Sequence, residues 1–523
     1  MNKSLYKKVS IASLIMMASV FLSRLIGLLR EIVIAYKGGT SLDVDAYQIA
    51  FVIPEILNHI VASGFLSVTF IPIFSEYLSK NKEEEGWKVF SIIFNGFGSM
   101  LILFIIICEI FAPQLVSITA PGIKDPLILE KAIRMTRIII PAQFFFFAGG
   151  MFMAVQFSKE KFSIPALAPL VYNLGIIIGG IMLSPLIGIE GFSWGVLAGA
   201  FIGNFMIQAI GAKKSGLKFK LIFNLFHPDL KKYIFLTLPL ILGLSMTFSA
   251  EFFLRYFGTY LSSGSIAALN YSLRVMLILS GIFGQAIGTA SFPFMARLFS
   301  DGKIFEMNQL LNKTLKYLCL VIPFSVLFII LRHEIIFILF QRGKFDSSAT
   351  QLTSNILICI MPGAFAFATQ TVVSRAYYAM QNTIFPAIFG TMAVISSIPI
   401  YMIGIKIMQA QGVAAAISVS AFLQVFLLFI LWNKKTKNKE AIYVYSFFTK
   451  IIFISLIIGL LSNWLKNNIF EFFNNSTLLG NMNSALLNTF VFVFMLLTFA
   501  YIFGIKEFSE IGLKLLKKIR KKT

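Results

Sequence analysis

The chain has 523 residues, of which 58% are hydrophobic and only 13% are charged, and its mean hydropathy is +0.84. This composition excludes an ordinary water-soluble domain and predicts an all-α polytopic membrane protein. The net charge of +22 does not indicate nucleic-acid binding, because the cations are spread over several loops and no soluble domain presents them. Contact with anionic membrane lipids accounts for these cations better.

Apolar stretches long enough to cross roughly 30 Å of hydrocarbon recur along the whole chain, and we expect about fourteen transmembrane helices. The stretches cover residues 10–36, 46–78, 89–112, 132–157, 164–187, 190–211, 233–257, 264–297, 313–332, 350–379, 384–405, 411–432, 444–465 and 484–505.

Lysine is concentrated in every second connection between these stretches. Short cytoplasmic loops retain such cations, so the basic connections predict the cytoplasmic side, and both termini are expected there. The basic segments contain Lys3, Lys7 and Lys8; Lys80, Lys82 and Lys88; Lys159 and Lys161; Lys213, Lys214, Lys218, Lys220, Lys231 and Lys232; Lys303 and Lys313; Lys434, Lys435, Lys437 and Lys439; and the tail from Lys514 to Lys522.

The second half of the chain repeats the first with an offset of 221 residues. A fixed period is the sequence mark of repeated architecture, and we expect an N-lobe at 1–220, a C-lobe at 221–440, and two further helices with a basic cytoplasmic tail at 441–523. Each lobe has about six helices, an even number, so both lobes have the same orientation, and a substrate site is expected between them. Matching residues are Pro72 and Pro293, Gly122 and Gly343, Asp125 and Asp346, Pro141 and Pro362, Pro165 and Pro386, and Gly191 and Gly412.

Nothing in the sequence indicates a disulfide framework, a metal site or an ATP motor. Cys108, Cys319 and Cys359 stand apart in apolar stretches and form no CxxC pair. The phosphate-binding motif G-x-x-x-x-G-K-[ST] does not occur. We therefore expect no cofactor, and a sodium ion, the membrane potential or a downhill substrate gradient as the source of energy.

Charged residues inside the apolar stretches are functional candidates, because each costs several kcal/mol unless it faces a polar cavity or a partner. In the first stretch, Ser23, Arg24, Gly27, Arg30 and Glu31 fall on one face of a helix. The opposite face is apolar. We interpret this helix as having one polar face with room for a ligand and one face for lipid or packing.

The second, seventh and eighth stretches carry the other charged groups. Glu55, Asn58 and His59 share a stripe directly after Pro54, which can loosen the helix. The remaining residues are Glu251 and Arg255, one turn apart; Asn270 and Arg274, also one turn apart; and the small residues Gly281, Gly284 and Gly288. We expect these polar groups to meet in a cavity between the two lobes.

Each of these residues also has a purely structural interpretation. Glu251 and Arg255 can neutralise one another on one helix face. Arg30 and Glu31 can lie at the level of the lipid head groups. His59 can be a buried histidine with its hydrogen bonds satisfied. Arginine in a membrane cavity nevertheless suits a phosphate-bearing ligand, because its planar fork donates paired hydrogen bonds and stays charged, and a lipid-linked pyrophosphate would need it.

With these residues identified, the chain resembles the MurJ (MviN) family of lipid II flippases, within a superfamily that includes multidrug exporters and polysaccharide flippases. The resemblance covers most of residues 15–435. It is carried by Ser23-Arg24-Leu25-Ile26-Gly27-Leu28-Leu29-Arg30-Glu31, Asp45-Ala46, Ile53-Pro54, Phe70-Ile71-Pro72, Pro165-Ala166-Leu167-Ala168-Pro169 with Asn173, Leu269-Asn270-Tyr271 with Arg274, and Arg375-Ala376-Tyr377-Tyr378-Ala379-Met380-Gln381-Asn382-Thr383.

The resemblance implies a protein of the bacterial cytoplasmic membrane that moves undecaprenyl-pyrophosphate-linked disaccharide pentapeptide from the inner to the outer leaflet for peptidoglycan synthesis. It implies that Arg24, Arg30 and Arg274 line a central cavity and hold the pyrophosphate, and that the helices after about residue 440 receive the polyprenyl tail. Cell-wall synthesis proteins are implied partners, and nucleic acid is not. His59 stands where relatives commonly have arginine, and Asn382 departs from a region where some relatives bind sodium.

We expect binding of the head group by Arg24, Arg30, Arg274, Glu31, Asn58, His59 and Arg255, with Gly27, Asp45, Pro54, Glu55, Glu251, Gly281 and Gly284 in structural or gating roles. The alternatives are a flippase for another lipid-linked oligosaccharide and a multidrug exporter, which would depend on acidic residues rather than on Arg24 and Arg274. A membrane glycosyltransferase would need an essential carboxylate on the outer face. Nothing around Asp43 and Asp45 looks catalytic, so we do not expect an enzyme. A scaffold for cell-wall proteins would not need buried arginines.

Overall fold

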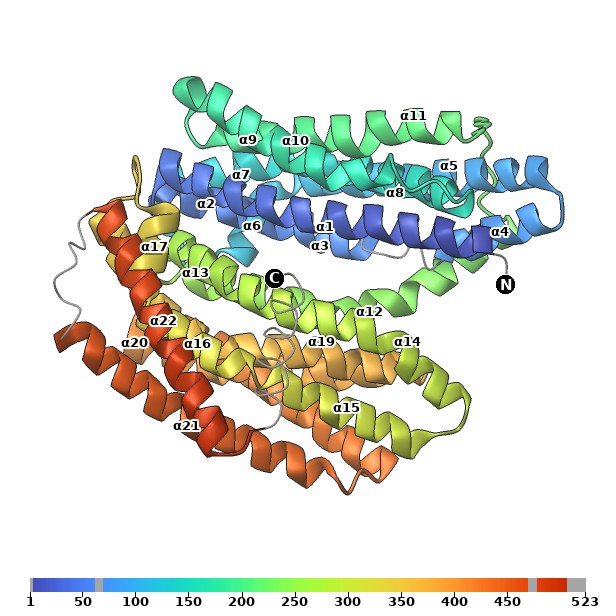
Figure 1. Cartoon of the computed structure of the whole chain (residues 1–523). Coiled ribbons are helices and arrows are strands. Elements are labelled where there is room, and N and C mark those ends of the chain that lie inside the picture. Colours follow the sequence, from blue (N-terminus) through green and yellow to red (C-terminus); the bar gives the residue numbers. More distant parts are fainter. Residues whose placement is uncertain (1–2, 62–68, 469–476, 506–523) are drawn as a thin grey trace. The chain divides into compact units, whose positions relative to one another are not determined.

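The computed structural model describes residues 3–61, 69–468 and 477–505, and within them every regular element is a helix (Figure 1). The predicted all-α class is confirmed. Helices are the expected solution in a bilayer, because each one satisfies its own backbone hydrogen bonds where no water is present to do so. The basic tail predicted beyond residue 505 lies outside the described residues.

The chain divides into two compact units. Unit 1 contains Met1–Ala267 with Arg342–Phe345, and unit 2 contains Ala268–Gln341 with Asp346–Thr523. This division follows helix packing, whereas the predicted borders at 220 and 440 follow the duplication. Those borders stay a prediction.

The helices of unit 1 are α1 (Lys3–Gly38), α2 (Leu42–Ala50), α3 (Val52–Val61), α4 (Ile71–Ser79), α5 (Glu83–Ile110), α6 (Ala112–Thr119), α7 (Pro126–Ile139), α8 (Ala142–Ser158), the short η2 (Pro165–Leu167), α9 (Ala168–Ile187), α10 (Glu190–Gly199), the π-helix η3 (Ala200–Met206), α11 (Ile207–Lys214) and α12 (Pro228–Gly258). A large apolar core that includes Phe70, Trp87, Phe90 and Phe147 holds α4, α5 and α8 together.

The helix α13 (Ser265–Ser280) leads from unit 1 into unit 2. The other helices of unit 2 are the π-helix η4 (Gly281–Gln285), α14 (Ala286–Ser300), α15 (Ile304–Leu318), α16 (Val321–Ile330), α17 (Arg332–Phe340), α18 (Ser347–Ile360), α19 (Gly363–Ala379), α20 (Ile384–Thr436), α21 (Ala441–Asn468) and α22 (Leu478–Ile502).

Within the described residues, nine helical segments are long and apolar enough to cross a membrane, or ten if α18 and α19, which meet at a bend of 48°, form one span. The segment α20 includes a break at Gln409, where φ is 50° and ψ is −123°. It therefore contains the two helices that the sequence predicts at 384–405 and 411–432. The predicted total of about fourteen stays a prediction.

The duplication is visible in the backbone. Residues with a left-handed φ recur at the same offset of 221 residues as the sequence matches, although non-glycine residues rarely adopt such a φ. The four pairs are Asn81 and Gly302, Glu160 and Gln381, Gly188 and Gln409, and Gly216 and Lys437. The two halves therefore turn in the same way at four equivalent places.

The matching residues Asp125 and Asp346 have the same structural role, since each caps the N-terminus of a helix. Asp125 accepts a hydrogen bond from Leu127 N at 2.9 Å and begins α7, and Asp346 accepts one from Ala349 N at 2.8 Å and begins α18. Such caps satisfy the first N–H groups of a helix. The hydrogen bonds from Ala349 N and the Ser348 hydroxyl hold the pKa of Asp346 below its usual range.

The helices α9 and α10 pack side by side with their backbones in contact (Figure 1). A Cβ on Gly195 would lie 2.8 Å from the carbonyl oxygen of Gly175, and Gly179 also faces Gly195. The two helices of α20 repeat this arrangement, since Gly404 and Gly412 contact each other's backbone. Small residues allow such close packing, which drives helix association in lipid, where the hydrophobic effect between helices is absent.

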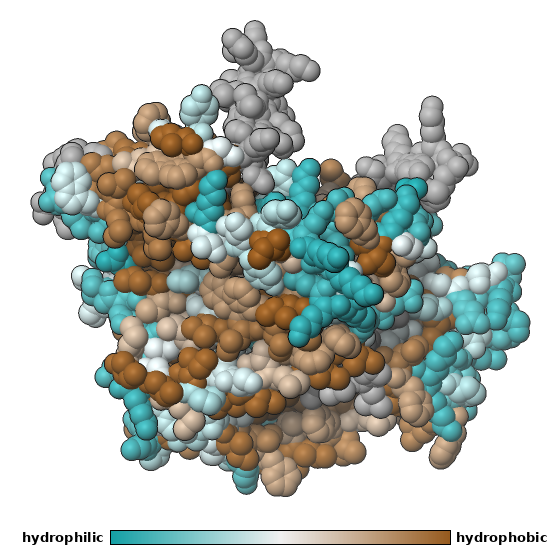
Figure 2. All heavy atoms as spheres, turned by 90° about the horizontal axis from the view of Figure 1, so that it is seen from below, coloured by the Kyte–Doolittle hydropathy of each residue, from teal (hydrophilic) through white to brown (hydrophobic). Residues whose placement is uncertain are grey.

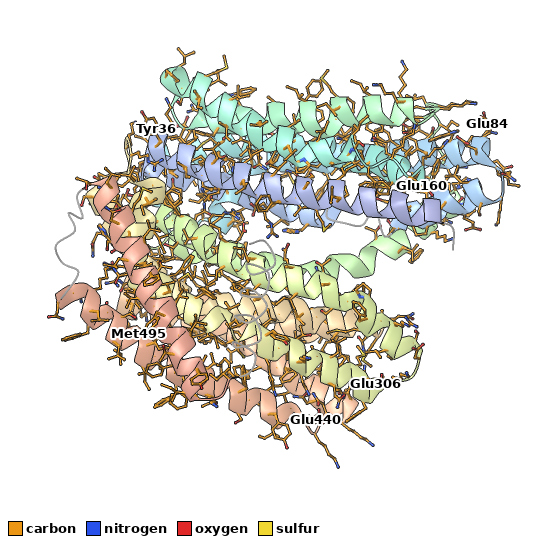
Figure 3. All side chains as sticks on the ribbon, in the orientation of Figure 1. Tyr36, Glu84, Glu160, Glu306, Glu440 and Met495 are labelled. Carbon is orange, nitrogen blue, oxygen red and sulfur yellow. The ribbon has the colours of Figure 1, made fainter. Side chains whose placement is uncertain are left out.

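The basic loops of unit 1 gather at one end of the unit, where Glu84 and Glu160 lie in Figure 3, while Tyr36 lies at the other end. Lys159 pairs with Glu83, Lys218 pairs with Glu84, and Lys161 Nζ donates to the carbonyl of Lys214 at 2.8 Å. Three basic connections predicted on one side are therefore neighbours. Apolar side chains cover broad areas of the face shown in Figure 2, as contact with lipid requires.

Replacing Gly195 by Ala should destabilise the protein, because the new Cβ would lie 2.8 Å from the Gly175 carbonyl oxygen. We expect a loss of about 1–3 kcal/mol, the usual cost of overpacking, measured by thermal unfolding of the detergent-purified protein. Gly27→Ala is the matched control, since its Cβ would meet nothing closer than 3.9 Å. Equal melting temperatures for the two variants would contradict this packing.

Candidate functional site

Arg30 lies on the predicted polar face of α1 and is held by two neighbours. Its Nη2 is 2.6 Å from Glu31 Oε1, and its Nη1 donates to Asn173 Oδ1 on α9 at 3.0 Å. Asn173 also donates to Ser23 Oγ at 3.4 Å, and its Oδ1 lies 3.9 Å from the Cβ position of Gly27. The face predicted from Ser23, Gly27 and Arg30 therefore packs toward one polar residue of α9.

The two ionisable ends of this face differ in exposure. Glu31 is buried, with 3% of its side chain exposed, whereas Arg24 is exposed and Arg30 is intermediate. Solvent exposure therefore decreases along this helix face, from the exposed Arg24 through the half-buried Arg30 to the buried Glu31.

Arg255 on α12 is bound by two carboxylates. Both of its terminal nitrogens contact Glu55 on α3, with Nη2 at 3.0 Å from Oε1, and Nη2 also lies 3.4 Å from Glu251 Oε2. Only 3% of the Arg255 side chain is exposed, against about a quarter of each glutamate. The sequence indicates the pairing with Glu251 one turn away. It does not indicate Glu55, which is the closer partner and comes from a distant helix.

These two groups form one electrostatic cluster. Glu31, which pairs with Arg30, is also close enough to interact with Arg255. Glu55 and Glu251 both act on His59, which lies half-buried on α3 with Asn58. The cluster thus places two arginines among three glutamates, so each guanidinium already has a carboxylate partner.

Tyr47 and Tyr172 extend the cluster. Both are close enough to Arg30 for electrostatic interaction, and Tyr172 also lies near Glu55. Neither tyrosine is among the predicted site residues, because an aromatic residue in an apolar stretch has no signature that separates it from ordinary packing. Each tyrosine hydroxyl group can both donate and accept a hydrogen bond.

Pro54 and Asp45 have clear structural positions. Pro54 lies in the first turn of α3, just after α2 ends. The first N–H groups of a helix have no partner within the helix, so the N–H that proline lacks costs no helical hydrogen bond there. Asp45 is buried and accepts hydrogen bonds from Gly264 N at 2.6 Å and Ala267 N at 2.8 Å. Asp45 therefore caps the first turn of α13.

The other candidates belong to unit 2. Asn270 is buried and Arg274 is half-buried, both on α13. Gly281 begins the π-helix η4. Gly284, also in η4, packs closely against Ala368, since a Cβ on Gly284 would lie 2.6 Å from the Cα of Ala368. The structure thus brings Arg30, Glu31, Glu55, Glu251 and Arg255 together in unit 1 and places Arg274 in unit 2.

No group of three or more His, Cys, Asp or Glu side chains among residues 3–61, 69–468 and 477–505 is arranged to hold a metal ion. The three cysteines are free thiols, two of them buried.

The chain is similar to known proteins over most of its length. The family model described as Lipid II flippase MurJ matches residues 34–483. The Lipid II flippase MurJ of Thermosipho africanus is 31% identical over 430 residues, which are 81% of this chain and 86% of that protein. The Probable lipid II flippase MurJ of Buchnera aphidicola subsp. Baizongia pistaciae is 29% identical over 416 residues, 78% of this chain and 80% of the relative.

Two solved structures agree with this relationship. The structure titled "Lipid II flippase MurJ, inward closed conformation" has a TM-score of 0.75 and 26% identity, and the match covers 94% of this chain and 99% of that one. An inward-facing multidrug resistance MATE family transporter has a TM-score of 0.67 at 14% identity over 79% of this chain and 94% of its own, which shows a shared fold alone. From the family model across residues 34–483 and these relatives, the chain belongs to the lipid II flippase MurJ family.

Proposed function

We propose that this protein moves lipid II from the inner to the outer leaflet of the bacterial cytoplasmic membrane, with both termini in the cytoplasm. Its substrate is the undecaprenyl-pyrophosphate-linked disaccharide pentapeptide. The observation that carries the proposal is the presence of arginines on helices of a membrane-embedded MurJ-family chain, with Arg30 and Arg255 held inside unit 1. An arginine within a membrane-spanning segment is costly unless it serves a polar ligand or a partner.

Arg24, Arg30 and Arg274 hold the pyrophosphate in this proposal. Arg24 is exposed on the polar face of α1, and Arg30 is fixed in direction by Glu31 and Asn173. A guanidinium that is already oriented loses less freedom when it binds a phosphate. Glu31 balances the positive charge of Arg30 before the substrate binds, and the phosphate balances that charge once it is bound. Asn58 and His59 contact the sugar and peptide parts of the head group.

Arg255 has a different part in the cluster. Its guanidinium is bound by Glu55 and Glu251, so it holds α12 against α3 and fixes both glutamates beside His59. In this proposal Arg255 does not contact the substrate and affects binding only by holding the neighbouring side chains in position.

Transport proceeds by alternating access, in which the two lobes rock around the bound head group while the lipid tail stays in the bilayer. Gly27 lies on the polar face of α1, Pro54 begins α3, Gly281 begins the π-helix η4, and Gly284 packs closely on Ala368; in this proposal these places allow the motion. The membrane potential drives the cycle in this proposal, because it acts on charge that moves across the field. A sodium gradient is the alternative source of energy.

The main alternative functions are a flippase for another polyprenyl-pyrophosphate-linked oligosaccharide and a multidrug exporter. The first would use the same arginines. The second is favoured by the fold shared with the MATE transporter. An exporter of cationic drugs would use its acidic residues, but Glu31, Glu55 and Glu251 are each paired with an arginine.

Replacing Arg24 or Arg274 by Ala should abolish complementation of a strain depleted of its own lipid II flippase, at unchanged protein level. Loss of one charge-assisted hydrogen bond costs about 1.5–3 kcal/mol, or roughly ten- to a hundredfold in substrate affinity. The control is Arg134→Ala, because Arg134 is an exposed arginine that pairs with Glu190 at 2.6 Å. Full complementation by both variants would overturn the assignment of Arg24 and Arg274 to the pyrophosphate.

Replacing Arg255 by Gln should destabilise the protein, because it leaves Glu55 and Glu251 without their cation. We expect a loss of about 3 kcal/mol in thermal unfolding, at the low end for a broken buried pair since both glutamates are partly exposed. The double variant Arg255→Gln/Glu55→Gln should recover a large part of this loss. Additive losses in the double variant would show that the pair is not coupled.

A further inference from the structure

A short loop from the second half of the chain is packed into unit 1. Residues Arg342–Phe345 follow α17 and lie against the C-terminal end of α1. The backbone N–H of Lys344 donates to the carbonyl of Tyr36 at 3.0 Å. Phe345 is buried, whereas the three residues before it are exposed. The second half thus reaches back to the first helix of the first half.

The equivalent loop of the first half makes the reciprocal contact. Gly122, which the duplication pairs with Gly343, follows α6 and lies against the C-terminal end of α12. Its N–H donates to Thr259 Oγ1 at 3.1 Å. Because α12 is the first helix of the second half, the loop of each half contacts the C-terminal end of the other half's first helix.

Glycine is required at both contacts for steric reasons. A Cβ on Gly122 would meet the backbone of Thr259, with Tyr260 N at 2.6 Å. A Cβ on Gly343 would lie 2.5 Å from the carbonyl oxygen of Tyr36, and Gly343 also has a φ of +59°. Backbone atoms cannot yield as a side-chain tip can, so any larger residue must push the two segments apart.

Further contacts join the same two corners. The Cβ position of Gly264, after α12, lies against the backbone of Thr40, after α1. Asp45 accepts from Gly264 N and Ala267 N. This end of unit 1 is therefore closed by contacts between segments that the sequence separates by more than 130 residues. It is the end opposite the basic loops (Figure 3).

We propose that Gly122 and Gly343 are paired latches that hold this end of unit 1 closed, and that both release when the end opens. The proposal rests on the alternating access proposed above, which requires one end to open while the other closes. Most residues of the two loops are exposed or half-buried, so their separation uncovers little apolar surface apart from Phe345. Two single hydrogen bonds and close backbone contact suit a joint that opens in each cycle.

The test measures access to a buried position behind the latches. Ser265 is 1% exposed and follows Gly264, so Ser265→Cys in a chain whose three native cysteines are replaced by serine is the reporter. A membrane-impermeant maleimide is applied to intact cells and, separately, to inverted membrane vesicles. Labelling is compared for Gly122→Ala, Gly343→Ala and the control Gly188→Ala. Gly188 has a φ of +64° but nothing within 4 Å of its Cβ position.

Gly122→Ala and Gly343→Ala should each raise the labelling of the reporter, and Gly188→Ala should not. A single steric change of ordinary size shifts a two-state equilibrium roughly 5- to 30-fold, and labelling should rise within that range. If an alanine variant does not accumulate, Thr259→Val removes the acceptor of the Gly122 hydrogen bond without added bulk and should raise labelling less. Unchanged labelling in both preparations, in folded protein, would overturn the latches.

This result is separable from the fate of the proposed function. Raised labelling in the latch variants, together with an unsubstituted chain that fails to complement flippase depletion, would support the latches and contradict lipid II transport. Complementation by the unsubstituted chain with unchanged labelling in every latch variant would do the reverse. Labelling that rises in inverted vesicles rather than in cells would support the latches but contradict the predicted orientation, in which the basic loops face the cytoplasm.

Discussion

The ion pair between Arg255 and Glu55 is the interaction on which the interior of unit 1 depends. A guanidinium with 3% of its side chain exposed cannot remain in a membrane protein without a compensating charge. Glu55 supplies that charge from α3 and Glu251 supplies a second from α12 itself. The pair therefore fixes two helices against each other and leaves Glu31 close by to orient Arg30. Burial of one cation thus ties α12 to α3.

Duplication and close packing explain how this cluster is built. The two halves share turns, caps and glycine contacts, as Gly188 and Gln409 show by their similar left-handed backbones. Glycine lets α9 and α10 pack backbone to backbone, and α9 also presents Asn173 to Arg30 of α1. The same repeat places Gly122 and Gly343 at reciprocal positions. A repeated unit thus provides both the rigid packing and the contacts that can separate.

Much of the fold is predictable from the sequence because apolar stretches and a fixed offset are local or periodic signals. The all-α class, the break between 384–405 and 411–432, and the Glu251–Arg255 pair follow from them. The contact of Arg255 with Glu55 does not, since 200 residues separate the two and a single sequence carries no trace of such a contact. Asn173 is recognisable only as part of the family resemblance. The packing of α12 within unit 1 likewise depends on tertiary contacts.

The most direct test of the account is to deplete this protein in its host and measure how much lipid II a membrane-impermeant cleaving enzyme can reach from outside. Total lipid II is measured in parallel after the membranes are opened. The account predicts that accessible lipid II falls while total lipid II persists, because the precursor is made but not moved. Unchanged accessibility at confirmed depletion would contradict it and would point to a different polyprenyl-linked glycan as the substrate.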